Sequence, residues 1–184
     1  IRAIDIFTPV RYGQRGGIVA GSGVGKSTLL GMLADADAFD CVVVALIGER
    51  GREVREFLED SIGERSMSKT VCIVATSDDS ALMRMAAPDT ALKAAEYFRD
   101  KGMRVLLLLD SITRYAHAIR EVAAAAGELP VTRGFPPSVF SELPKQLERA
   151  GPGMSGSGSI TAFITVLVDG DDHNDPISDA VRGI

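Results

Sequence analysis

Short apolar runs alternate with helical patterns along this chain, and the apolar runs predict buried β-strands. Residues 41–47 contain no polar side chain, which is typical of a parallel strand covered on both faces. Strands followed by helices predict βαβ units, so we expect an α/β fold: a three-layer sandwich around a mainly parallel sheet. A first strand is expected to close at 18–20, and further strands are expected at 41–47, 69–75, 105–109 and 160–168. The helices are expected at 25–34, 49–60, around 91–98, 115–126 and 138–150.

Prolines and glycines mark the expected irregular segments. Pro88 is expected to kink its helix or divide it in two, and Pro144 to interrupt the helix over 138–150. A turn is expected at 134–137, and a loop rich in glycine and serine at 151–159.

Length and composition narrow the class of protein. A chain of 184 residues with 46% hydrophobic and 24% charged residues predicts one globular domain. No apolar run approaches the roughly 20 residues of a membrane span, which predicts a soluble protein. A formal net charge of −5 argues against a nucleic-acid-binding module. Cys41 and Cys72 lie in apolar runs and are expected to be reduced core thiols, and the absence of an initiator methionine suggests a fragment.

Between the first strand and its helix lies a phosphate-binding pattern, G-x-x-x-x-G-K-[ST], with alanine in place of its first glycine. Such a loop presents backbone N–H groups at a helix N-terminus, where they attract phosphate. The lysine would reach the β- and γ-phosphates of a nucleotide, and the serine hydroxyl would bind Mg²⁺. A glycine-rich turn with a chance lysine is the alternative, but the flanking strand and apolar helix favour the phosphate site. The residues are Ala20, Gly21, Ser22, Gly23, Val24, Gly25, Lys26, Ser27 and Thr28.

Two further strand ends carry candidate catalytic groups. Asp110 follows the strand over 105–109, which is the expected position of a carboxylate on the magnesium side of a nucleotide site. The alternative role for Asp110 is an N-cap of the next helix, and both roles can coexist. Glu49 follows the strand over 41–47 and could polarise a water for attack on the γ-phosphorus, with Arg50 stabilising the transferred group. Taken alone, Glu49 could equally be an acid in the first turn of a helix.

Five ordered blocks resemble the catalytic core of the type III secretion ATPases, and the flagellar export ATPases most of all. This family is related to the subunits of F- and V-type rotary ATPases. The resemblance covers essentially the whole chain, and the ordered set of blocks is far more specific than any one of them. The blocks are 20–28, 48–56, 110–115, 132–140 and 170–184.

The resemblance implies a RecA-like domain over residues 1–184, without the family's N-terminal β-barrel and C-terminal helical domain. It assigns ATP and Mg²⁺ as cofactors, and places the family's arginine finger and adenine-contacting aromatics beyond Ile184. A glutamate at position 49 implies a catalytic rather than a non-catalytic ring subunit. The implied roles are phosphate and Mg²⁺ binding by Lys26 and Ser27, catalysis by Glu49, γ-phosphate contact by Arg50, support of magnesium-bound waters by Glu53, magnesium-side binding by Asp110, and a nearby polar contact by Arg114.

The family works as a homo-hexameric ring in the cytoplasm, peripheral to the membrane through the export apparatus. Its implied partners are that apparatus, stalk and regulator proteins, and exported substrates or chaperones. We therefore expect Mg²⁺-dependent ATP hydrolysis that energises flagellar protein export. A virulence secretion ATPase, a non-hydrolysing structural ring subunit and a nucleic-acid translocase are the alternatives, and the acidic charge disfavours the last.

Other polar residues have plainer interpretations. The acidic segment 169–176, which includes His173, could be a metal site, but its spacing fits neither a calcium loop nor a zinc set. An acidic surface loop is the favoured interpretation. His117 is expected to be packed or solvated rather than catalytic, and Ser111 has no matched histidine that would make it a nucleophile.

Overall fold

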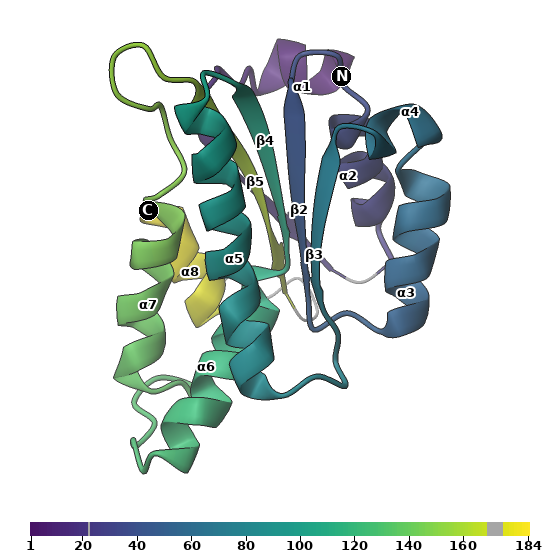
Figure 1. Cartoon of the computed structure of the whole chain (residues 1–184). Coiled ribbons are helices and arrows are strands. Elements are labelled where there is room, and N and C mark those ends of the chain that lie inside the picture. The colour runs from purple at the N-terminus through teal and green to yellow at the C-terminus, as the bar shows by residue number, and fades with distance from the viewer. Residues whose placement is uncertain (22, 169–174) are drawn as a thin grey trace.

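A parallel sheet of five strands forms the centre of the fold in the computed structural model, which describes residues 1–21, 23–168 and 175–184 (Figure 1). The strand order is β1-β5-β4-β2-β3, and every neighbouring pair is parallel. The predicted three-layer α/β architecture is confirmed. The strands are β1 (Arg15–Ala20), β2 (Cys41–Ile47), β3 (Thr70–Ala75), β4 (Arg104–Asp110) and β5 (Ser159–Leu167).

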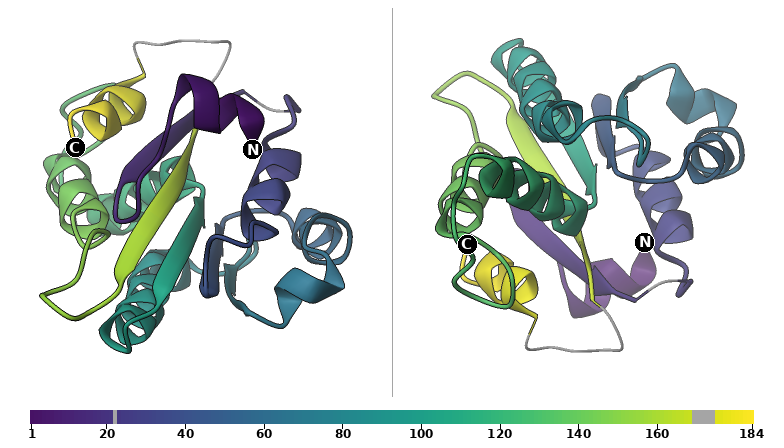
Figure 2. Two further views of the ribbon diagram at one scale, coloured as in Figure 1. Left: turned by 90° about the horizontal axis from the view of Figure 1, so that it is seen from above. Right: turned by 90° about the horizontal axis from the view of Figure 1, so that it is seen from below.

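Helices cover both faces of this sheet (Figures 1 and 2). One face packs against α5 (Ala81–Asp100), α6 (Ile112–Ala125), α7 (Pro137–Leu147) and α8 (Pro176–Arg182). The other packs against α1 (Arg2–Phe7), α2 (Lys26–Ala34), α3 (Gly51–Glu56) and the π-helix η1 (Phe57–Ser61), and α4 (Glu64–Met67) precedes β3. None of the helices in the described part of the chain has the length and apolar character needed to span a membrane.

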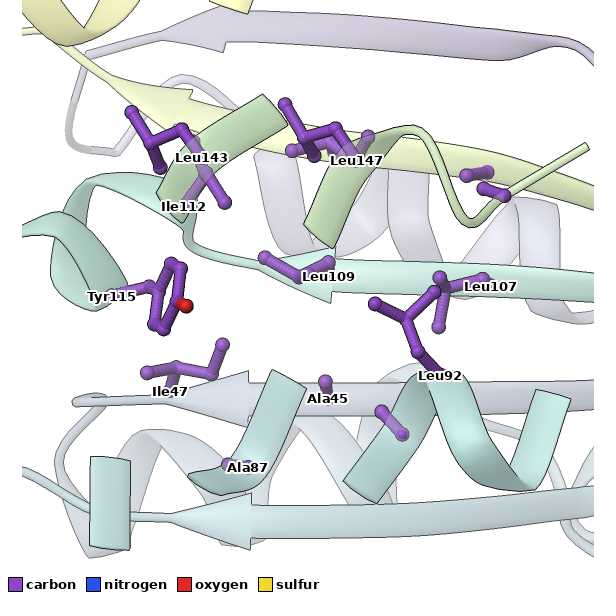
Figure 3. Close-up of a cluster of buried hydrophobic side chains, with 14 of the residues drawn as sticks. Ala45, Ile47, Ala87, Leu92, Leu107, Leu109, Ile112, Tyr115, Leu143 and Leu147 are labelled. Atoms are coloured by element: carbon purple, nitrogen blue, oxygen red, sulfur yellow. The ribbon is translucent and has the colours of Figure 1, made fainter. Parts of the chain in front are cut away.

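The central strands are apolar because both of their faces are covered. Every residue of β2 is buried, as the unbroken apolar run predicts, and so is every residue of β4 after Arg104. On the α5–α7 face, side chains from β2 and β4 interdigitate with those of the helices (Figure 3). Each fully buried leucine contributes about 1.5–3 kcal/mol to this packing.

The prediction that Pro88 divides its helix is wrong, because α5 runs unbroken through it. A proline removes one backbone hydrogen bond, here the one to the Arg84 carbonyl. Burial of Pro88 together with Ala87, Ala91 and Leu92 against the sheet offsets that loss. Pro144 likewise lies inside α7 without interrupting it, although α7 ends at Leu147, before the predicted end at residue 150.

Other helix limits also differ from the predicted ones. The predicted helix over 49–60 is α3 followed by the π-helix η1, and Val54 and Phe57 are buried on one face as expected. The helix expected at 115–126 begins earlier, at Ile112, because Ser111 caps it. Three short helices were not predicted: α1, α4 and α8. A signal for α8 is visible in the sequence, because Asp175 caps it and Pro176 occupies its first turn.

The topology brings three segments of distant sequence to one sheet edge. β5 lies between β1, which leads to the phosphate-binding pattern, and β4, which ends at Asp110. β2, on the other side of β4, ends one residue before Gly48 and two before Glu49. Because parallel strands end at the same edge, these groups meet there.

Candidate active site

The loop between β1 and α2 has the backbone shape that the phosphate-binding pattern predicts. Gly23 and Gly25 have φ angles of 77° and 92°, in the left-handed region that favours glycine. Gly25 is the N-cap of α2 and provides no side chain for its first N–H groups. Such a helix start suits a phosphate group. Ser27 and Thr28 are exposed in the first turn, and Ser22 lies outside the described residues.

Lys26, at the start of α2, joins the three segments. Its Nζ donates a hydrogen bond of 2.6 Å to Asp110 Oδ1 and lies 3.6 Å from Glu49 Oε1. The three side chains are between 5% and 13% exposed, so their charges interact more strongly than charges on an open surface. The structure therefore brings together the lysine and both carboxylates that the sequence singles out.

Asp110 is the most buried of these groups. Its Oδ1 accepts the hydrogen bond from Lys26 and another from Thr165 Oγ1, each 2.6 Å long. The alternative role of Asp110 as a helix N-cap is wrong, because Ser111 is the N-cap of α6 and accepts from the Arg114 N–H. This cap is also a structural role for Ser111, consistent with the expectation that it is not a nucleophile.

Glu49 is held by its backbone while its side chain stays incompletely paired. The Gly48 N–H donates to the Ala75 carbonyl at 2.6 Å, and the Ser77 N–H donates to the Glu49 carbonyl at 2.9 Å. Glu49 Oε1 is buried and has no hydrogen-bond partner; 3.6 Å from Lys26, it has only a charge interaction. The alternative of a first-turn helix acid is wrong for Glu49, because it precedes both Arg50, the N-cap, and the first turn of α3.

The environment of Glu49 raises the pKa of its carboxyl group. Burial is the largest cause, followed by a side-chain hydrogen bond with Glu53 and the charge of Asp110; Lys26 and Arg114 oppose the shift. The pKa of Glu53 is lowered, mainly by the same hydrogen bond. A proton is therefore held on Glu49 more tightly than on an exposed glutamate, and Glu53 accepts the hydrogen bond from it.

The two arginines named by the sequence occupy different positions. Arg50 is 75% exposed and pairs with Glu53 at 3.5 Å. The Arg114 side chain packs over Gly48, where a Cβ added to the glycine would lie 3.0 Å from Arg114 Cβ. Arg114 is also close enough to Glu49 to lower its pKa. The structure thus places the Arg114 side chain beside Gly48 and leaves the Arg50 side chain largely in solvent.

The residues at this edge fit a magnesium ion that is bound mostly through phosphate and water. Ser27 offers a hydroxyl and Asp110 a carboxylate, and the unpartnered Oε1 of Glu49 is a further buried acceptor. Over residues 1–21, 23–168 and 175–184, no group of three or more His, Cys, Asp and Glu side chains could hold a metal. Magnesium sites built on nucleotide phosphates need only one or two protein carboxylates.

His117 and the two cysteines, for which no catalytic role was expected, have structural surroundings that agree with that expectation. His117 is half-buried and stacks on Phe135 with ring centroids 5.7 Å apart. Burial lowers its pKa. Cys41 and Cys72 are free thiols, as expected. Residues 169–174, which include His173 and most of the acidic segment, lie outside the described residues.

A separate cavity of about 1150 Å³ lies along β1, α7 and α8. None of the predicted site residues that the structure describes lines it; its charged lining includes Arg15, Glu96 and Arg149. Arg149 is already paired there, with Glu96 at 2.8 Å and Asp89 at 2.7 Å. Lys26, Glu49 and Asp110 meet elsewhere, at the carboxyl edge of the sheet.

Thr165 is the site residue that sequence reasoning missed. It lies in β5, is fully buried and donates to Asp110 Oδ1. A signal was available, because a hydroxyl near the end of an apolar strand needs a buried partner. Without the strand order, however, the sequence does not tell which neighbour supplies it.

A family model described as the ATP synthase alpha/beta family, nucleotide-binding domain, matches residues 1–184. The chain belongs to this family. The resemblance noted in the sequence is thereby confirmed at the family level. In this family member, the loop with the phosphate-binding pattern leads to Lys26, which meets Glu49 and Asp110 at the sheet edge.

Named relatives of this family member include a flagellum-specific ATP synthase from Rhizobium meliloti (strain 1021). It is 67% identical over all of this chain, which covers 39% of its length. A solved structure of a prototypical ATPase from the type III secretion system of pathogenic bacteria superimposes with a TM-score of 0.95. It is 59% identical, over all of this chain and 53% of that one.

A second solved structure is that of the assembled ATPase EscN in complex with its central stalk EscO, from enteropathogenic E. coli. It has a TM-score of 0.91 and 57% identity over all of this chain and 43% of that one. The chain thus spans about two fifths of the length of the curated relatives it matches.

Proposed function

We propose that residues 1–184 form one RecA-like domain of an ATPase that energises flagellar protein export. The observation that carries this proposal is the arrangement of Glu49: a carboxylate only 12% exposed, with one buried, unpartnered oxygen 3.6 Å from the lysine of the phosphate loop. A subunit that only bound nucleotide would need the lysine but not a carboxylate kept free beside it.

In the proposed reaction, the glycine loop and the first turn of α2 bind the phosphates through N–H groups, and Lys26 contacts the β- and γ-phosphates. Glu49 Oε1 accepts a hydrogen bond from the attacking water and orients it for in-line attack. As the water oxygen bonds to the γ-phosphorus, the bond from phosphorus to the β–γ bridging oxygen breaks. Glu49 takes up the proton, and the products are ADP and phosphate.

The raised pKa of Glu49 suits this role, because a general base works best when its pKa lies nearer to the working pH. Arg114, packed over Gly48, supplies positive charge beside Glu49. When bound, Mg²⁺ would supply positive charge that offsets the negative charge of the phosphates. Ser27 and Asp110 are the residues that would hold it, while Glu53 would support its waters and Arg50 the γ-phosphate region.

We propose that the protein acts as a homo-hexamer in the cytoplasm, peripheral to the membrane through the export apparatus. The solved structure of assembled EscN with its central stalk supports a ring and a stalk partner. Regulator proteins, exported substrates and chaperones complete the proposed partners. The flagellum-specific relative, at 67% identity, supports the flagellar branch, and the loss of motility or of virulence secretion on deletion would distinguish the two branches.

The experiment is Mg²⁺-dependent phosphate release by the full-length protein, compared with Glu49→Gln. Glutamine keeps the size and hydrogen bonding of glutamate but cannot take up the proton. We expect wild type to turn over, and Glu49→Gln to bind ATP but turn over about 10²–10⁴ times more slowly.

Two results would contradict the proposal. If both proteins assemble and bind nucleotide but neither turns over, the chain belongs to a structural, non-hydrolysing subunit. If both turn over equally, Glu49 is not the general base.

A further inference from the structure

Thr165 stands out among the residues that the proposed mechanism does not use. Its side chain is fully buried in β5, on the sheet face that packs against α2. It pairs with Ile18 of β1, and the β4–β5 register that joins Leu109 to Ile164 places it opposite Asp110. Thr165 therefore lies between the phosphate-loop strand and the strand that carries the magnesium-side carboxylate.

The hydroxyl of Thr165 makes a short hydrogen bond to a charged acceptor. Oγ1 lies 2.6 Å from Asp110 Oδ1 and 3.3 Å from the Leu109 carbonyl. A hydroxyl has a single hydrogen, and the shorter contact to the carboxylate takes it, because bonds to charged acceptors are the stronger ones. The hydroxyl is thus committed to Asp110.

Both donors to Asp110 converge on the same oxygen. Lys26 and Thr165 each donate to Oδ1, at 2.6 Å. A carboxylate is planar, so two donors on one oxygen restrict rotation of the group and fix the direction of Oδ2. The two donors differ in rigidity: Lys26 has a long side chain and serves the phosphates, whereas Thr165 is anchored inside a strand.

We propose that Thr165 is a positioning residue, whose hydroxyl holds the Asp110 carboxylate so that Oδ2 faces the metal side of the nucleotide. The inference rests on the proposed function, because it gives Asp110 its magnesium-side role. Thr165 itself touches neither nucleotide nor metal; it acts through Asp110. When Lys26 turns toward the phosphates, Thr165 remains the fixed donor on Oδ1.

β5 offers a matched control. Thr161 lies four residues earlier on the same face and is 1% exposed. Its Oγ1 accepts a hydrogen bond of 3.0 Å from the Gly13 N–H, at the opposite end of the strand. Thr161→Val therefore removes a buried hydroxyl from the same strand without altering the surroundings of Asp110.

The experiment uses the full-length protein as Thr165→Val, Thr165→Ser and Thr161→Val. The primary measurement is the affinity for a fluorescent ADP analogue, once with Mg²⁺ and once in EDTA. In EDTA we expect Thr165→Val to bind the ADP analogue as tightly as wild type does. The factor by which Mg²⁺ raises that affinity should be about tenfold smaller in Thr165→Val, which is the value of a hydrogen bond to a charged group. Its kcat for ATP hydrolysis falls by a similar factor. Thr165→Ser restores both, and Thr161→Val changes neither.

Thermal melting separates this role from packing. Both valine variants are expected to lower Tm similarly, so a loss of Mg²⁺-dependent affinity in Thr165→Val alone supports positioning. An unchanged Mg²⁺ effect in a folded Thr165→Val would overturn the proposal, as would failure of Thr165→Ser to restore it. Should Thr165→Val not fold, Thr165→Cys replaces it and is expected to show a partial loss, because a thiol is a weak donor.

The outcome is separable from that of the proposed function. The ratio of nucleotide affinities with and without Mg²⁺ is measurable whether or not the wild-type protein hydrolyses ATP. Loss of that ratio in Thr165→Val without wild-type turnover would retain the positioning role and reject the ATPase. Wild-type turnover together with an unchanged affinity ratio in Thr165→Val would retain the ATPase and reject the positioning role.

Discussion

The two ends of β4 each carry a charged residue in an ion pair, and the two pairs are built differently. At the amino end, Arg104 donates to Asp40 from its backbone N–H at 2.8 Å, from Nε at 3.0 Å and from Nη2 at 2.7 Å. Both carboxylate oxygens are used, and these bonds lower the pKa of Asp40 to about 2. The pair is largely solvent-exposed.

At the carboxyl end, Lys26 lies between the carboxylates of Asp110, 5% exposed, and Glu49, 12% exposed. The two differ in how many hydrogen bonds they accept. Asp110 accepts two hydrogen bonds on Oδ1, whereas Glu49 Oε1 has none. Burial raises the pKa of Glu49, the opposite direction to that of Asp40. In the Arg104–Asp40 pair both carboxylate oxygens accept hydrogen bonds, and the pair stabilises the start of β4. A buried acceptor without a partner, such as Glu49 Oε1, costs stability and is available for chemistry.

The sharpest way to break this comparison is to remove the lysine at the carboxyl end. Lys26→Met deletes the cation between the two carboxylates and the proposed contact to the phosphates. We expect phosphate release to fall by about 10²–10³, the value of one preorganised electrostatic donor. The matched control is Lys69→Met, because Lys69 Nζ donates to the Ala36 carbonyl at 2.8 Å near the amino edge. That variant should lower Tm and leave turnover per folded protein unchanged; an equal loss in both would contradict the account.

The acid limb of the pH–rate profile tests the state of Glu49. In the proposed mechanism, turnover needs Glu49 without its proton. The pKa of Glu49 is raised, so activity should fall with decreasing pH at a higher pH than it would with an exposed glutamate. Glu53→Gln removes the carboxylate that accepts the hydrogen bond from protonated Glu49, so the limb should move to lower pH. Glu56→Gln, which removes the exposed partner of Arg52 on the same helix, should leave it in place. A limb that stays fixed in Glu53→Gln would exclude the proposed coupling.

Gly48 connects the backbone at the carboxyl end to Arg114. Its φ of 69° is strained for alanine, by about 1–2 kcal/mol, and a Cβ would also meet Arg114. Gly48→Ala should therefore lose both stability in urea unfolding and several-fold in kcat. Gly102→Ala has a similar φ of 85° but open space around the Cβ, so it should lose stability alone. Equal kcat in the two variants would show that the position of Arg114 does not matter.

The smallest effect is expected at the amino end of β4. The folded pKa of Asp40 is depressed, so its pairing adds stability above the ordinary pKa of 3.8 and loses it as pH falls toward about 2. Asp40→Asn should thus lower Tm slightly at neutral pH. The loss in the free energy of unfolding should be less than about 1 kcal/mol, because the pair is exposed. The difference from wild type should vanish across that acid range. A difference that grows on acidification would contradict the assignment.

Much of this site could be predicted because strand ends carry its chemistry. The glycine pattern, Asp110 and Glu49 each follow an apolar run, and parallel strands end at one edge. Thr165 was missed since a threonine fits any strand, and its partner depends on β5 lying between β1 and β4. The position of Arg114 depends on side-chain packing over Gly48, and Arg50 lies largely in solvent beside Glu53; no pattern in the sequence reveals either.

The fold likewise has features that the sequence predicts and features that depend on packing. Fully apolar runs predicted β2 and β4 almost to the residue, since burial on both faces leaves no alternative. Helix limits were less predictable: local capping by Ser111 moved the start of α6, and tertiary packing carried α5 through Pro88. Propensity alone does not include these terms of packing and capping.

The central claim is that Asp110 is fixed for binding and Glu49 is left open for chemistry. The most direct test measures the affinity for a fluorescent ADP analogue, with and without Mg²⁺, in full-length Glu49→Gln and Asp110→Asn. The account predicts that Glu49→Gln keeps the affinity gained with Mg²⁺ and that Asp110→Asn loses most of it. The claim is contradicted if Glu49→Gln loses that gain as fully as Asp110→Asn, or if Asp110→Asn keeps it.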